Sequence, residues 1–119
     1  EPNKVWCKNA AMLCVVISRK NFEHNEKPAV THGYDTGSAW ENLALEGASR
    51  NLVVHGMAGF DYEKAKVDLK IPDVFDVMAM FAAGHQAPKE TLPEPVRKME
   101  APSGRKKIEE IMMEGCFRT

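Results

Sequence analysis

Residues 35–66 read DTGSAWENLALEGASRNLVVHGMAGFDYEKAK, a stretch that predicts a helix, a strand and a second helix in direct succession. Apolar or small residues recur at three- and four-residue spacing from Trp40 to Ala48, the pattern of one helical face. The side chains on this face become smaller toward Gly47 and Ala48. We therefore predict a helix over 35–51 whose second half packs tightly against a neighbouring element.

Both helices of this stretch carry start signals. Asp35 or Ser38 can supply the N-cap of the first helix, and Ser38 with Glu41 matches a capping box. Asp61 is a good N-cap for the second helix, YEKAKVDLK, and Pro72 prevents its continuation.

Three short apolar runs predict the strands of a sheet: residues 12–18, 52–57 and 76–85. Apolar and polar residues do not alternate in residues 12–18 and 76–85, so we expect these two strands to be buried, the first of them on both faces. Buried strands between helices indicate the α+β class, with helices on both faces of the sheet. Three strands leave exposed edges, which favours pairing with another polypeptide. The proline-rich residues 86–107 predict an extended surface segment.

The composition is that of an ordinary globular protein, and we expect one domain over residues 1–119. Sixteen basic and 17 acidic residues give no field to attract nucleic acid, and the apolar runs are too short to span a membrane. Cys7, Cys14 and Cys116 form no CxxC pattern, which argues against disulfides and structural zinc and favours a cytoplasmic location.

Familiar catalytic motifs are absent from the sequence. No GxSxG elbow supports a Ser-His-Asp triad. The four histidines, His24, His32, His55 and His85, lack metal-ligand spacing. We interpret them as solvated or hydrogen-bonded side chains in a loop and at strand ends, and we predict no metal site. A small metal-dependent hydrolase stays a minor alternative.

The strand end HGMAGF, residues 55–60, contains two glycines and an alanine, which raises the question of why small residues are needed there. Glycine serves where a turn needs positive φ or where another group approaches the backbone closely. Gly56, Ala58 and Gly59 expose backbone N–H groups ahead of a helix, which suits an anion or the polar edge of a flat ligand. A tight strand-to-helix turn explains the same residues.

The second candidate is the turn PSGRKK, residues 102–107. Ser103 and Gly104 free the backbone, and Arg105 brings a guanidinium that suits a phosphate group. A solvated basic turn is the alternative.

Taken together, four segments resemble the C-terminal portion of the FMN-dependent nitroreductase family. They are NAAMLCVVIS, residues 35–66, IPDVFDVMAMFAAGH and LPEPVRKMEAPSGRKKIEEIMMEGCF, in the family's order over nearly the whole chain. The resemblance implies an α-β-α layered sandwich with a mixed sheet, here incomplete at its N-terminus because the family's phosphate-gripping first helix has no counterpart.

The resemblance also implies a cofactor site. Met57, Ala58 and Gly59, with Gly56 before them, match the backbone that runs beside the flavin ring of FMN. Arg105 matches the residue that binds the FMN phosphate, with Ser103 nearby where many relatives carry lysine. No residue needs to act as an acid, base or nucleophile, because the flavin carries the redox chemistry.

The implied function is an oxidoreductase that passes hydride from NAD(P)H through FMN to nitroaromatic or quinone-type acceptors. Family members are homodimers, which the exposed sheet edges also favour. The rival is a non-catalytic truncated relative that oligomerises or binds through the surface its missing part would cover.

Overall fold

The computed structural model describes residues 3–117 of the chain. The chain divides into two compact units, Glu1–Ala87 and Pro88–Thr119, and each is described by itself. The elements of the first unit are α1 (Lys4–Cys7), β1 (Met12–Arg19), α2 (His32–Ser49), β2 (Val53–Met57), α3 (Tyr62–Asp68) and β3 (Phe75–Gly84).

The three strands form one sheet in the order β1-β3-β2. β3 pairs antiparallel with both neighbours, with Met12 opposite Ala83 on one side and Val53 opposite Gly84 on the other. The α+β class is as predicted. The expectation of a mixed sheet was wrong for the described strands: β1 and β2 run in the same direction, but β3 lies between them, so no two parallel strands are neighbours.

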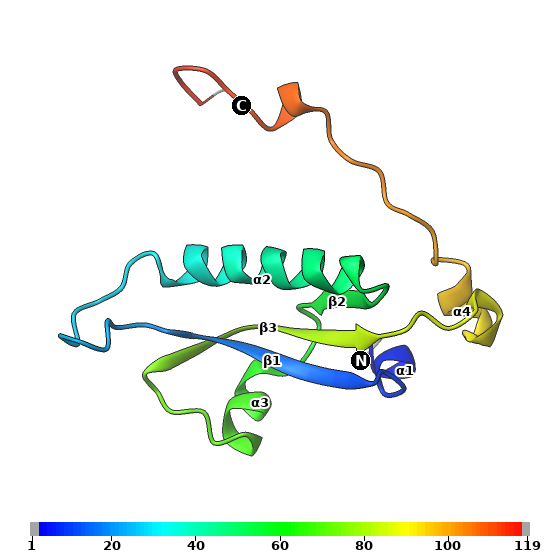
Figure 1. The fold of residues 1–119 in the computed structure, drawn as a ribbon, viewed down its shortest axis with the longest axis horizontal. Helices are drawn as coiled ribbons and strands as arrows, with labels where there is room; N and C mark the ends of the chain where they lie inside the picture. The colour runs from blue at the N-terminus through cyan, green and yellow to red at the C-terminus, as the bar shows by residue number, and fades with distance from the viewer. Residues whose placement is uncertain (1–2, 118–119) are drawn as a thin grey trace. The chain divides into compact units, whose positions relative to one another are not determined.

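Helices cover both faces of this sheet, as predicted. α2 packs on β1 and β2 from one side, and α3 packs on β3 from the other (Figure 1). The second half of α2 lies tightly on the sheet, because a Cβ on Gly47 would clash with Cγ2 of Val54. The tight packing expected at the small end of the helical stripe is confirmed.

Buried apolar residues of β2 and β3 lie on both faces of the sheet. Phe81 and Ala82 of β3 are buried, as is Met57 at the end of β2. The Trp40 ring of α2 sits 5.4 Å from the Phe81 ring, measured between centroids. Aromatic pairs at this separation add to the apolar area that they bury, so Trp40 ties α2 to β3.

Burial on both faces was a wrong prediction for the edge strand β1. Met12, Leu13 and Ile17 are exposed. β1 has a neighbour on one side only among the described strands, and α2 makes more of its contact with β2. A continuous apolar run therefore identified the strand correctly but not its coverage.

The predicted start is correct for α3 and wrong for α2. Asp61 caps α3 as predicted, because its Oδ1 accepts a 2.8 Å hydrogen bond from the Lys64 backbone N–H. α2, however, begins at His32 with Thr31 as N-cap, ahead of both proposed caps. The Ser38 hydroxyl donates to the Tyr34 carbonyl oxygen instead of capping.

The second unit contains only short helical turns among its described residues. These are η1 (Lys89–Thr91), α4 (Glu94–Arg97) and η2 (Ile108–Glu110). The proline-rich segment is thus mostly without helix or strand, as expected, apart from η1 and α4. Within residues 3–117, no helix combines the length and hydropathy needed to cross a bilayer.

Candidate functional site

The strand-end segment, residues 56–59, closes β2 and precedes α3. Met57 is buried, whereas Ala58 and Gly59 are exposed. The Phe60 backbone N–H donates to the Ala58 carbonyl oxygen at 3.0 Å. The backbone N–H groups of Ala58 and Gly59 donate to no other residue that the structure describes. The segment therefore offers two backbone donors at the surface.

Contacts within the chain explain why the two glycines of this segment lack side chains. A Cβ on Gly56 would lie 3.0 Å from Cζ2 of Trp40, and a Cβ on Gly59 would lie 3.0 Å from Nδ2 of Asn3. Neither glycine has a positive φ. Glycine is therefore required at these two positions because other side chains approach the backbone closely, and not because the turn is left-handed.

The basic turn, residues 102–107, lies in the second unit and is exposed throughout. The Arg105 Nη1 atom donates to the Ser103 carbonyl oxygen at 3.1 Å and lies 2.7 Å from the Ser103 hydroxyl oxygen. Among the described residues these bonds and one to Gly104 use Nη1 only, so Nε and Nη2 keep their donors for an anion. The strand-end segment and the basic turn belong to different units.

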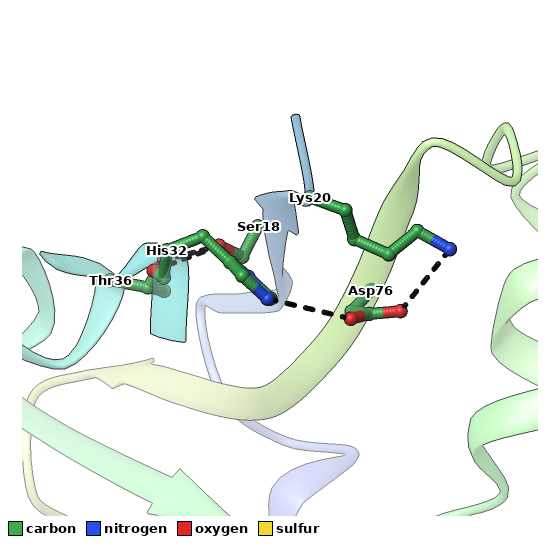
Figure 2. A network of polar contacts seen from close by, with 5 residues as sticks. All are labelled: Ser18, Lys20, His32, Thr36 and Asp76. Carbon is green, nitrogen blue, oxygen red and sulfur yellow. Dashed lines mark hydrogen bonds and ion pairs between the residues drawn. The ribbon is translucent and has the colours of Figure 1, made fainter. Parts of the chain in front are cut away.

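A polar cluster that the sequence interpretation missed joins α2 to the sheet. Figure 2 shows Ser18 of β1 beside His32 and Thr36 of α2, with Asp76 of β3 on the far side of the imidazole. The Ser18 Oγ lies 2.9 Å from His32 Nδ1 and accepts a 2.8 Å bond from the Thr36 hydroxyl. His32 Nε2 is 3.9 Å from one Asp76 oxygen, and Lys20 Nζ is 3.7 Å from the other.

Serine, histidine and aspartate do meet in this cluster, but the arrangement does not suit a hydrolase. Ser18 is only 5% exposed, and its hydroxyl is enclosed by bonds to the first turn of α2. A nucleophilic serine has to reach its substrate. The cluster instead fastens the start of α2 to the sheet, which also explains why this helix begins at His32.

The remaining histidines have ordinary structural partners. The His55 ring makes an edge contact with Trp6 at a centroid distance of 4.8 Å, and His85 Nδ1 lies 3.2 Å from the Asn51 carbonyl oxygen. His24 Nε2 lies 2.9 Å from the Asn25 side-chain amide. His32 is in a helix and His55 is within β2, which corrects their expected loop and strand-end positions. Across residues 3–117, no group of three or more potential ligand side chains could hold a metal ion.

An open groove of about 490 Å³ runs between α2 and β1. Val15, Ile17, Trp40 and Leu43 contribute apolar side chains to it, and Asp35 adds a carboxylate. The groove follows from the partial cover of β1, because α2 leaves the outer part of this strand exposed.

Comparison with known proteins gives two kinds of relative, although no family model matches the chain. The chain is 32% identical, over 108 residues, to an uncharacterised 15.4 kDa protein of Mycolicibacterium smegmatis, covering 90% of this chain and 72% of that protein. It superposes on the crystal structure of an oxidoreductase containing FMN with a TM-score of 0.91 and 37% identity, covering 99% of this chain.

A second solved structure, a nitroreductase family protein from Clostridium difficile, matches 92% of this chain with a TM-score of 0.64 and 15% identity, which shows the shared fold. The chain thus resembles FMN-containing oxidoreductases and proteins of the nitroreductase family, and it shares their fold. The resemblance stated from the sequence is confirmed. The chain spans 61% of the length of the FMN-containing oxidoreductase and 62% of the nitroreductase family protein from C. difficile.

Proposed function

We propose that this chain is a member of the nitroreductase family, contributes to an FMN site and serves in an FMN-dependent oxidoreductase. The observation that carries the proposal is the close structural likeness, at 37% identity, to an oxidoreductase that contains FMN. Residues 56–59 would lie beside the flavin ring, and Arg105 would hold the FMN phosphate with Ser103 close by.

The residues of each segment suit the role proposed for them. The Gly59 N–H, which has no partner among the described residues, can donate to a nitrogen of the flavin ring and stabilise negative charge on the reduced ring. Buried Met57 and the contact of Gly56 with Trp40 fix the start of the segment from the two faces of the sheet, so the segment needs little rearrangement on binding. Arg105 has guanidinium donors to spare for a phosphate oxygen pair.

FMN, when bound, supplies the redox chemistry by accepting hydride from NAD(P)H and reducing nitroaromatic or quinone-type acceptors. The protein residues bind and orient it, and none is required as an acid, base or nucleophile. We propose a homodimer in the cytoplasm, which agrees with the three free cysteines Cys7, Cys14 and Cys116.

A titration of FMN with the purified chain tests this function through quenching of flavin fluorescence. Arg105→Ala removes a charge-assisted bond worth about 1.5 to 3 kcal/mol, so we expect an affinity about 10- to 100-fold lower. Lys106→Ala is the matched control, since it removes one charge from the same exposed turn. Equal losses in both variants would indicate general charge attraction, and no quenching at high micromolar FMN would refute the proposal.

The second candidate function is an oligomerising or binding domain without flavin. The open apolar groove between α2 and β1 favours it, because exposed apolar surface promotes association. A colourless protein that cannot be reconstituted with FMN but sediments as an oligomer would support this candidate. A yellow protein with a bound-flavin absorbance band would support the first.

A further inference from the structure

The Asn3 side chain does not cap the helix that it precedes. Asparagine is among the strongest N-cap residues, and Asn3 occupies the N-cap position of α1. Its side chain makes no capping bond there. Instead, Nδ2 donates to the carbonyl oxygen of Gly59 at 3.2 Å, 56 positions away in the sequence.

α1 is held against β2 by a separate contact. Trp6, one turn after Asn3, makes the edge contact with the His55 ring described above. The same short helix thus contacts the middle of β2 through Trp6 and the segment after β2 through Asn3. Two contacts from one turn of helix fix where the Asn3 amide lies relative to Gly59.

Both peptide units that flank Gly59 are held by hydrogen bonds. The carbonyl oxygen of the Ala58–Gly59 peptide accepts from the Phe60 N–H, and the carbonyl oxygen of the Gly59–Phe60 peptide accepts from Asn3. Glycine loses more backbone freedom on folding than any other residue. The two hydrogen-bonded peptide units therefore define the conformation of Gly59, which has no side chain to restrict it. The Gly59 N–H remains without a partner among the described residues.

We propose that Asn3 is a positioning residue of the FMN site, which orients the Gly59 backbone so that its N–H faces the ligand in advance of binding. This inference rests on the proposed function. The Asn3 amide does not itself need to touch FMN. It acts on the Gly59–Phe60 peptide, and fixing that peptide restricts the adjoining Ala58–Gly59 peptide, which carries the Gly59 N–H. Gly59 has to be glycine partly because a Cβ there would push the Asn3 amide away.

The variant Asn3→Leu tests the inference, because leucine has a similar size but no donor. Asn9→Leu is the matched control, since Asn9 is exposed in the same unit and its side chain bonds to no described residue. In the chain without FMN, we expect the Phe60 amide to exchange with solvent about two- to tenfold faster in Asn3→Leu, the effect of one neutral hydrogen bond. The Ala65 amide of α3 should not change.

The FMN arm of the experiment compares affinity and flavin midpoint potential. We expect Asn3→Leu to weaken FMN binding about two- to tenfold and to make the potential more negative, with the urea midpoint unchanged. A merely structural role would lower the urea midpoint and leave the potential of the bound flavin in place. Gly59→Ala serves as a second variant, because it displaces the same amide from the other side.

The outcomes separate the two claims. Failure of the unmodified chain to bind FMN overturns the proposed function, and with it the role of Asn3 toward FMN. If the unmodified chain binds FMN while Asn3→Leu matches it in Phe60 exchange, affinity and potential, the positioning role alone is overturned. Faster Phe60 exchange together with weaker FMN binding, in Asn3→Leu and not in Asn9→Leu, supports the inference.

Discussion

The strand-end segment, exposed except at Met57, and the fully exposed basic turn are both rich in small residues, yet different contacts hold them in place. Gly56 and Gly59 are enclosed by side chains from α2 and from the start of the chain, Trp40 and Asn3. Arg105 bonds only to the two residues immediately before it, among those described. Tertiary contacts determine the conformation of the strand-end segment, whereas only local hydrogen bonds hold the basic turn.

This difference separates preorganised binding from binding that must order its own groups. A backbone fixed by tertiary contacts loses little entropy when a ligand arrives, whereas an exposed arginine loses side-chain freedom. Mutations of the groups that pack on Gly56 should therefore change the stability of the fold, and mutations of the basic turn should change only what it binds.

The largest expected effect comes from Trp40→Ala. The Trp40 ring packs on Phe81 and fills the space above Gly56, so its loss opens a cavity at the centre of the first unit. We expect the free energy of unfolding to fall by about 3 kcal/mol, the low end for a tryptophan because the ring is half-buried. Urea denaturation measures this free energy, and a loss below 1 kcal/mol would contradict the claim that tertiary contacts fix the strand-end segment.

Gly56→Val should have the next largest effect. Its Cβ would meet the Trp40 ring at 3.0 Å, and the two further methyl carbons have to displace the ring. We expect a loss of about 1 to 3 kcal/mol, as for other overpacked sites. The double variant with Trp40→Leu is the control: if ring contact is the cause, Gly56→Val should cost clearly less in that background.

Ser18→Ala tests the attachment of α2 that places Trp40. The substitution removes the common partner of the Thr36 hydroxyl and the His32 imidazole in a mostly buried position. We expect a loss of about 1 to 2 kcal/mol. Ser38→Ala on the same helix, where the hydroxyl bonds to the preceding turn at an exposed position, should change stability far less. Equal losses would show that the cluster is not a specific attachment.

The smallest effect on stability is expected from Arg105→Ala. All of its described partners are local and exposed, so the free energy of unfolding should change by less than about 0.5 kcal/mol. This result sharpens the comparison when set beside the large loss in FMN affinity expected for the same variant. A loss of more than 1 kcal/mol would mean that the basic turn contributes to the fold.

The sequence predicted those features that depend on local pattern. Continuous apolar runs identified β1 and β3, β-branched residues identified β2, and Asp61 identified the start of α3. The predicted start of α2 was wrong because the residue that fixes it, Ser18, belongs to strand β1 and lies outside the helix sequence. Local capping preference alone could not reveal that partner.

The candidate site was predictable in part for the same reason. Gly56 and Gly59 indicated either a tight turn or close approach by another group, but not which of the two, nor which groups approach. Asn3 carried a signal that was not used: it is a strong capping residue directly before a short helix. Only the folded chain shows that its side chain turns to Gly59.

The central claim is that two differently built segments serve one cofactor, and an FMN titration followed at the backbone amides by heteronuclear NMR tests it most directly. We predict that the amide signals of Met57, Ala58 and Gly59 and those of residues 103–105 shift together with a single binding constant. Small shifts at the first group would reflect its fixed geometry, and loss of motion at the second would reflect its ordering. Binding of FMN that leaves either group unchanged would contradict the claim.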